Sequence, residues 1–443
     1  MRQGSSHNAT IKQILFCCYS MSPCCHQSAV RRSTLDVLLF TSMVTIAAAR
    51  FDDPDFYLGE PNATFAELRA TDPVHWYDEG KFWVVTKYED IKGISARPEK
   101  FKSERIGIMM DLIAHREGRD PQGYQTRGIM FMDPPEHRAH RKAIGVRFTP
   151  AAVAKMEARV RQVVNEALDD LPNGEFDWIE RIAEPIPVFV FAYLLGVPEE
   201  DWPKVAGWAT TIANVGSGLA TDDDMALIFD QIGPYLLNLA AERKSNPQDD
   251  LLTMLSQVTV GGEPFNDAQV MIYALTLLAA GSETTQSLIA GIADCLDANP
   301  EQADRLFADP GLAGNAVEEV LRYWTPVMSM ARQAAHDVEM RGATIEAGDG
   351  LLLAYASANR DPDHWGDSAE QFDITRQDAA GHLGFGVGEH FCMGAALARR
   401  EARLLLEEIV KRASGLRVTG ERVPRASALV HTHDHLPVVL NYR

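Results

Sequence analysis

The sequence contains few cysteines outside its first 25 residues, which limits the ways in which the chain could be held together. Of six cysteines in 443 residues, only Cys295 and Cys392 lie in the body of the chain. A disulfide framework would distribute its cysteines through the fold, so this placement favours a reducing compartment. The sequence also lacks the spaced cysteines of an iron–sulfur protein and the Gly-x-Gly-x-x-Gly fingerprint of dinucleotide-binding folds. The chain is therefore not expected to carry an iron–sulfur cluster or a nicotinamide site of its own.

Positive charge is scarce as well. The 42 lysines and arginines are outnumbered by 62 acidic residues, which gives a net charge of −20. A nucleic-acid partner is excluded, because the phosphate backbone would be repelled. The sequence shows neither internal repeats nor low-complexity tracts, and its hydrophobic content of 46% is ordinary for a globular protein. A chain of this length can bury a core large enough to enclose a cofactor and an apolar cavity.

The first 42 residues differ from the rest, because they are basic and hold the remaining four cysteines at positions 17, 18, 24 and 25. A zinc site is disfavoured there, since adjacent cysteines lack the usual spacers. The apolar run from 37 to 49 is shorter than the roughly 20 residues that a bilayer-spanning helix needs. We expect residues 1–42 to be a disordered leader added by an upstream start, with a weak peripheral anchor as the alternative. Residues 43–443 are expected to form a single domain with no stable membrane anchor.

Helical patterns dominate the rest of the chain. The longest covers residues 267–298, begins at a cap that is either Asn266 or Asp267, and stops before Pro300. Short alternating segments at 74–77, 82–86 and 338–356 predict a few strands, and the polar stretch 105–126 predicts a long loop over a site. The fold class that follows is mainly α with a small β region. Further helices are predicted at 150–171, 204–213, 222–244, 314–323 and from 393 onward.

The segment from Phe385 to Ala395 is the most informative part of the sequence. It places Cys392 in a glycine-rich loop just before a strong helical pattern. Glycines allow the loop to turn tightly around the sulfur, and amide N–H groups at the helix start can point at a thiolate. A single sulfur ligand suits haem iron better than zinc, which takes four protein ligands. The alternative for a lone cysteine is a small buried thiol in an ordinary turn.

A second unusual segment lies in the middle of the long helix. There Glu283 and Thr284 interrupt an apolar pattern, which is unfavourable unless the two residues have a task. Gly281 and Thr284 share a helix face, so the glycine would leave a notch beside a hydroxyl, able to seat a diatomic ligand and relay protons to it. The alternative is a kinked helix with a solvated Glu283.

Three segments together resemble the cytochrome P450 family. Its cysteine loop, Phe-x-x-Gly-x-x-x-Cys-x-Gly, is matched at Phe385, Gly388, Cys392 and Gly394. Its oxygen-binding segment is similar to residues 280–285, and its Glu-x-x-Arg pair resembles Glu319 and Arg322, with Arg376 as the third member of the triad. The order of the segments along the chain is also that of the family, and the resemblance runs from about residue 50 to the end.

The resemblance implies the triangular, mostly helical fold of a soluble bacterial-type haem-thiolate monooxygenase, with residues 43–443 as the catalytic domain. Haem b would be bound with Cys392 as its axial iron ligand, while Gly281, Glu283 and Thr284 would serve oxygen binding and proton delivery. The triad Glu319, Arg322 and Arg376 would be structural. Further contacts to the cofactor are expected from Ala280, Phe385, Gly386 and Gly394, and contacts to its propionates from His137, Arg141, Arg332 and His390. His140 has no counterpart and is expected at the surface.

Substrate and partners are expected as follows. Apolar, flexible residues suit a hydrophobic molecule such as a terpenoid or steroid, unless they belong to the plain core. Electrons are expected from a ferredoxin and its NAD(P)H-dependent reductase, in the cytoplasm, with docking on the side of the cysteine loop. A haem-thiolate peroxygenase or isomerase is one alternative, which the Glu283–Thr284 pair disfavours, and a non-catalytic haem-binding sensor is the other. The candidate pocket residues are Met109, Met110, Ile113, Val327, Met328 and Met330, and the candidate docking cations are Arg138, Arg141, Lys142, Arg399, Arg400 and Arg403.

Overall fold

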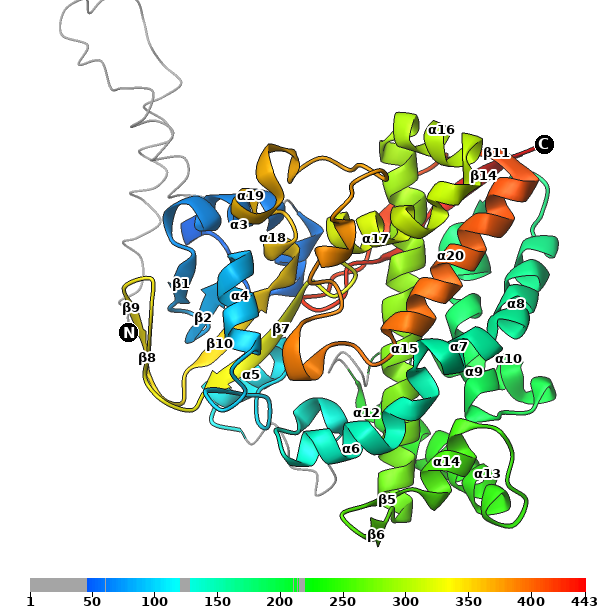
Figure 1. Ribbon diagram of the computed structural model, residues 1–443, viewed down its shortest axis with the longest axis horizontal. Helices are drawn as coiled ribbons and strands as arrows, with labels where there is room; N and C mark the ends of the chain where they lie inside the picture. Colours follow the sequence, from blue (N-terminus) through cyan, green and yellow to red (C-terminus); the bar gives the residue numbers. More distant parts are fainter. Residues whose placement is uncertain (1–45, 60, 120–127, 210, 213, 215–219) are drawn as a thin grey trace, which may run out of the picture. The chain divides into compact units, whose positions relative to one another are not determined.

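A helix of 32 residues, α15 (Asp267–Ala298), is the longest element of the computed structural model, which describes residues 46–59, 61–119, 128–209, 211–212, 214 and 220–443 (Figure 1). The expected leader, residues 1–42, lies outside the described residues. Of the two candidate caps, Asn266 is the one that caps α15: its side chain accepts from the Gln269 N–H at 2.9 Å, and Gln269 Oε1 accepts from the Asn266 N–H at 3.0 Å. The helix ends where Pro300 begins α16 (Pro300–Ala308).

In the described part of the chain, six α-helices pack against α15: α16 and also α9 (Pro185–Leu195), α13 (Gly233–Ser245), α14 (Leu251–Gln257), α17 (Ala313–Tyr323) and α20 (Ala395–Arg412). The protein is 58% helical, so the predicted mainly α fold class is confirmed. The other α-helices that the structure describes are α3 (Pro61–Thr71), α4 (Tyr88–Ser95), α5 (Met109–Arg116), α6 (Glu136–Ile144), α7 (Pro150–Lys155), α8 (Glu157–Asp169), α10 (Trp202–Gly207), α12 (Asp222–Leu227), α18 (Tyr355–Ala358) and α19 (Pro362–Trp365).

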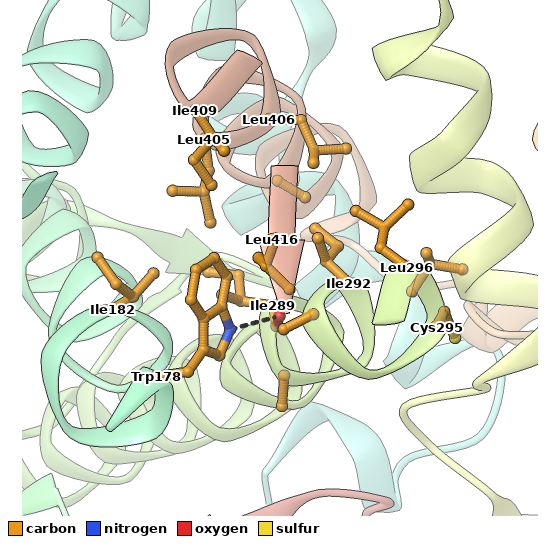
Figure 2. Packing of buried hydrophobic residues seen from close by; sticks show 14 of the residues in the cluster. Trp178, Ile182, Ile289, Ile292, Cys295, Leu296, Leu405, Leu406, Ile409 and Leu416 are labelled. Atoms are coloured by element: carbon orange, nitrogen blue, oxygen red, sulfur yellow. Dashed lines mark hydrogen bonds between the residues drawn. The ribbon is translucent and has the colours of Figure 1, made fainter. Parts of the chain in front are cut away.

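Two hydrophobic clusters divide α15 between them. The first half packs with α9, α13 and α14, while Ile289, Ile292 and Leu296 of the second half pack with α17 and α20. Figure 2 shows the second cluster around Trp178, whose indole Nε1 donates to the Ile289 carbonyl at 2.9 Å. This bond satisfies the only polar atom of a fully buried side chain. Both clusters therefore fix the position of the segment between them, which carries Glu283.

The β region is small, as predicted. Its largest sheet has five strands in the order β1 (Val74–Tyr77), β2 (Phe82–Val85), β10 (Gly350–Ala354), β7 (Ser329–Ala334) and β3 (Phe101–Lys102). The pair β2–β10 is parallel, and the others are antiparallel. Smaller sheets join β11 (Ala413–Val418), β14 (Pro437–Tyr442) and β4 (Glu175–Asp177), then β12 (Val423–Pro424) with β13 (His433–His435), β5 (Thr259–Val260) with β6 (Glu263–Pro264), and β8 (Val338–Met340) with β9 (Ala343–Ile345).

The predicted loop 105–126 is wrong in part, because α5 occupies Met109–Arg116. Asp111 explains the helix: its Oδ2 accepts from the N–H groups of Gly107 and Ile108, both at 2.9 Å, at the start of the first turn. A carboxylate at the N-terminal end of a helix satisfies orphan donors and suits the dipole. Residues 120–127 lie outside the described part of the chain. Among the helices that the structure describes, none combines the length and apolarity required to cross a membrane.

Candidate active site

The cysteine loop lies between β10 and α20 in the chain and is closed by its own backbone. The Cys392 N–H donates to the Phe385 carbonyl at 2.8 Å. Gly386 and Gly388 adopt left-handed conformations, with φ of 67° and 78°. A Cβ on Gly388 would lie 2.3 Å from the carbonyl oxygen of Ser95 in α4, so only glycine fits at this position. The predicted tight turn around the sulfur is therefore present.

Cys392 is a half-buried residue that lies three positions before the start of α20. Burial raises the pKa of the Cys392 thiol, while hydrogen bonds from the amides of Gly394 and Ala395 and the charges of Arg141 and Arg399 act in the opposite direction. A bound cation would complete the stabilisation of the thiolate. Within the described residues, no group of three or more His, Cys, Asp and Glu side chains could hold a metal. The sulfur therefore suits a metal that brings its other ligands with it.

The middle of α15 exposes one face although its neighbours are buried. Ala280 is exposed and Thr284 is half-buried, whereas Ala279 and Glu283 are buried. Thr284 Oγ1 donates to the Ala280 carbonyl at 2.6 Å. An exposed patch of this kind, inside the fold and bearing a hydroxyl, is a surface that a large planar cofactor fits.

Glu283 is 7% exposed, and burial raises its pKa to about 7. The nearest cation is Arg425, whose Nη1 lies 3.8 Å from Glu283 Oε1 and lowers the pKa without offsetting the burial. A carboxyl group with a pKa near neutrality can both accept and donate a proton. Glu283 is not the solvated side chain of the alternative interpretation.

The predicted notch at Gly281 is filled on the side where a side chain would point. A Cβ on Gly281 would lie 1.9 Å from the ring of Phe191, which comes from α9. The glycine therefore lets α9 pack closely against α15. A role for Gly281 in oxygen binding stays a prediction.

The four residues of the predicted propionate clamp, two histidines and two arginines, come from three elements of the structure. The rings of His137 in α6 and His390 in the 3-10 turn Gly388–His390 lie 4.2 Å apart. His137 Nδ1 and His390 Nε2 are buried and lack a hydrogen-bond partner among the described residues. Burial lowers the pKa of both imidazoles, and Arg141 and Arg332 lower them further. Arg332 in β7 is 5% exposed, and its Nη1 donates to the Ala331 carbonyl at 2.6 Å. Unpaired donors and buried positive charge fit anionic groups such as propionates.

The predicted triad comes together behind the cysteine loop. Glu319 and Arg322 are fully buried, and the guanidinium donates to both carboxylate oxygens at 2.7 and 2.8 Å. Arg376 Nε lies 3.3 Å from the same carboxylate. Arg322 also donates to the carbonyls of Asn359, Ala369 and Gln371 at 2.7–2.8 Å. The cluster ties α17 to the chain that leads into the loop, which is a structural role.

An apolar pocket lies beside α5. Of the predicted residues, Met109, Met110 and Ile113 line it, together with Ile108, Asp52, Pro54 and residues 427–429. Val327 and Met328 run alongside this lining: Val327 pairs with Val430, and the Met328 N–H donates to the Leu429 carbonyl at 2.9 Å. Met330 packs instead against the sheet core, so the core interpretation holds for it.

Sequence reasoning missed Arg425 and the pocket residues Ser427, Ala428 and Leu429. The one signal for them is an apolar stretch at 426–430 between short strands. The prediction that His140 lies at the surface is wrong. His140 is 5% exposed, and its Nδ1 lies 2.6 Å from the hydroxyl of Tyr273, which satisfies the imidazole in the interior.

Most of the predicted docking cations are ion-paired. Arg399 pairs with Glu318 at 2.7 and 2.9 Å and Arg403 with Glu407 at 3.1 Å. These pairs neutralise much of the positive charge that the sequence placed near the cysteine loop. The other two pairs are Arg138 with Glu389 and Arg400 with Glu157.

The fold and the site define a haem-thiolate oxygenase, and known proteins agree. A family profile described as cytochrome P450 matches residues 312–424. The chain is 33% identical to the methyl-branched lipid omega-hydroxylase of Mycobacterium bovis over 416 residues, covering 89% of this chain and 95% of the relative. It is 32% identical to the linalool 8-monooxygenase of Pseudomonas putida over 401 residues, with 88% and 98% covered.

Solved structures show the same relationship. Cytochrome P450 CYP109Q5 from Chondromyces apiculatus has a TM-score of 0.78 at 31% identity and covers 89% of this chain and 98% of its own. CYP109E1 from Bacillus megaterium, in complex with testosterone, has a TM-score of 0.76 at 29% identity, with 86% and 99% covered. The chain belongs to the cytochrome P450 family and is a P450 monooxygenase, an enzyme class that works with a haem-thiolate cofactor and redox partners.

Proposed function

We propose that this monooxygenase hydroxylates a small-to-medium hydrophobic molecule, such as a terpenoid or a steroid, with O2 and two electrons from a ferredoxin. The observation that carries the substrate class is the pocket beside α5, where apolar side chains of α5 face residues 428–429. Named relatives support the class, since they act on a methyl-branched lipid and on linalool, and a solved neighbour holds testosterone. The free cysteines of the described chain suit the cytoplasm, and residues 43–443 would form the catalytic domain.

The cofactor would be haem b, held by Cys392 and by the propionate clamp. Haem supplies the activation of O2 and the transfer of oxygen to a C–H bond when it is bound. Cys392 would supply the sulfur ligand to the iron, stabilised by the Gly394 and Ala395 amides. The unpartnered nitrogens of His137 and His390, with Arg141 and Arg332, would bind the propionates. Ala280, Phe385, Gly386 and Gly394 would contact the macrocycle.

Thr284 and Glu283 would deliver protons to the oxygen side of the site. Thr284 presents its hydroxyl on the exposed face of α15 and anchors it on the Ala280 carbonyl, which leaves the oxygen lone pairs free to accept a proton. Glu283, with a pKa of about 7, would take protons from the solvent side and pass them on.

Docking of the ferredoxin would depend on the end of α6. Lys142 is exposed, and a Cβ on Gly145 would lie 3.7 Å from Met393 Sδ, so this end of α6 abuts the cysteine loop. K142E should slow reduction by an acidic ferredoxin several-fold at low ionic strength, and the difference should vanish at high salt. R403E is the matched control, because Arg403 is already paired with Glu407. Equal effects of the two variants would contradict this docking site.

The experiment that tests the function starts with haem-loaded protein. A panel of terpenes, steroids and branched fatty acids should include ligands that shift the iron from low to high spin. With ferredoxin, its reductase and O2, these ligands should give hydroxylated products, and L429R should lose both responses because a charge enters the pocket. Product with peroxide alone would favour a peroxygenase, and no response to any apolar ligand would favour a sensor. C392A should lose the thiolate-type spectrum of the reduced, CO-bound protein.

A further inference from the structure

One loop joins the apolar pocket to the buried acid of α15. Residues 425–432, here called the 425–432 loop, connect β12 to β13. Its tip, residues 427–429, lines the pocket. Ser427 Oγ shapes the tip by accepting from the N–H groups of Leu429 and Val430 at 3.2 and 3.0 Å. Its first residue, Arg425, faces Glu283. The same short segment therefore touches the space for the substrate and a group that would move protons.

The loop is held firmly at its other end. His431 stacks on Trp324 with ring centroids 3.6 Å apart, and His431 Nδ1 donates to the Trp324 carbonyl at 2.8 Å. Trp324 Nε1 donates back to the His431 carbonyl at 2.8 Å. The Arg425 N–H donates to the Thr432 carbonyl at 3.0 Å. The backbone of the loop is therefore fixed at both ends, and Arg425, at one of these ends, stands two residues before the tip in the chain.

Arg425 lies between carboxylates that compete for its charge. Its Nε donates to Asp434 on β13 at 2.6 Å, whereas its Nη1 is 3.8 Å from Glu283, beyond hydrogen-bond distance. Glu184, which precedes α9, also feels this guanidinium, which lowers its pKa against the effect of burial. Arg425 is 31% exposed and Asp434 51%, while Glu283 is only 9% exposed at the side chain. A small rotation of the arginine side chain would exchange a surface partner for a buried one.

We propose that Arg425 is a positioning residue that controls whether Glu283 carries a proton, and that contact with the tip of the 425–432 loop shifts the guanidinium between Asp434 and Glu283. Engaged with Glu283, the guanidinium stabilises the carboxylate, which is then ready to accept a proton from the solvent side. Engaged with Asp434, it leaves Glu283 neutral and able to donate its proton. Occupancy of the pocket would thereby set the state of the proton donor. The relevance of this control to turnover rests on the function proposed above.

The test measures the protonation of Glu283 directly, in the haem-loaded full chain without substrate. Infrared difference spectra across pH report the C=O band of a neutral carboxylic acid, and E283Q assigns the band. R425M should raise the pKa of Glu283 and D434N should lower it, each changing the ratio of ionised to neutral Glu283 about tenfold at pH 7. R422M, on the same hairpin and paired with Asp294 and Asp297 of α15, should leave the band unchanged.

R425M and D434N are predicted to shift the pKa of Glu283 in opposite directions, which a general loosening of the hairpin would not produce. Shifts in the same direction, or an equal shift in R422M, would overturn the proposal. Coupling to the pocket is tested with L429W, which fills the pocket from the tip. It should move the midpoint of the Glu283 titration, and the R425M background should abolish this effect. An unmoved midpoint in L429W would refute the coupling. These readouts need no turnover, so inactive protein with the predicted shifts would count against the proposed function alone.

Discussion

Burial of Glu283 should make the protein less stable as the pH rises, and E283Q should remove this dependence. The pKa is raised from 4.5 to about 7 because the carboxyl is desolvated on α15. Below pH 4.5 both folded and unfolded states are protonated at this position, so the group has no effect. Between 4.5 and 7 the unfolded chain ionises first, and the folded state loses stability until the pH passes 7.

The magnitude follows from the raised pKa. The pKa of Glu283 rises by about 2.5, and each pKa unit corresponds to about 1.36 kcal/mol. The folded state is therefore destabilised by about 3 kcal/mol at pH 8, a cost that is absent at pH 4.5. The free energy of unfolding of E283Q relative to the unmodified protein should therefore increase by about 3 kcal/mol between these pH values. The comparison between pH values cancels the constant cost of burying the amide, so the sign does not depend on how well Gln packs.

Urea denaturation of the haem-loaded protein at several pH values between 4.5 and 8 measures this difference. E263Q is the control: Glu263 is exposed on β6, and its replacement should change stability by no more than about 0.5 kcal/mol at each pH. A difference between E283Q and the unmodified protein that stays constant with pH would refute the argument that burial sets the pKa of Glu283.

Three further predictions concern the residues around the site. G281A should cost about 1–3 kcal/mol of stability because its methyl group meets the Phe191 ring, and F191L should restore part of the loss in the double variant, as measured by urea denaturation. R322K should cost about 3–5 kcal/mol and reduce haem-loaded yield, since lysine cannot replace the five hydrogen bonds of the fully buried guanidinium; normal yield and stability would contradict this role. T284A should bind substrate normally but lower the ratio of product formed to O2 consumed, while T284S retains it; equal ratios in the two variants would exclude the hydroxyl from proton delivery.

The parts of the site that could be predicted are those whose signals are local in sequence. The cysteine loop and the Glu283–Thr284 pair each lie within a dozen residues, where glycines, a helix start and an acid in an apolar helix have direct physical meanings. The long α15 was predictable for the same reason, because the residues near its two ends, Asn266 and Pro300, indicate where it begins and ends.

The parts that could not be predicted depend on residues far apart in the chain. Arg425 and Glu283 are more than a hundred positions apart in the chain, and the sequence around either residue gives no indication that the two side chains meet. His140 is interior only because Tyr273 satisfies its ring nitrogen. The docking cations were predicted from their density in the sequence, but three of the six pair with acids from other elements and a fourth, Arg403, pairs within α20, which neutralises much of their charge. The close contact of Gly281 with Phe191 of α9 could not be predicted either, because no pattern in the sequence of α15 indicates it.

The pocket is built from segments far apart in the chain, which bears on biosynthesis, because residues 108–113 are synthesised long before residues 427–429. The 425–432 loop precedes β14, and β14 pairs with β4 through Pro437, Val438 and Val439. A nascent chain in which these residues are still inside the ribosomal exit tunnel would lack both the pocket wall, residues 427–429, and β14. Chains that end before β12 should therefore be unable to recognise an apolar ligand.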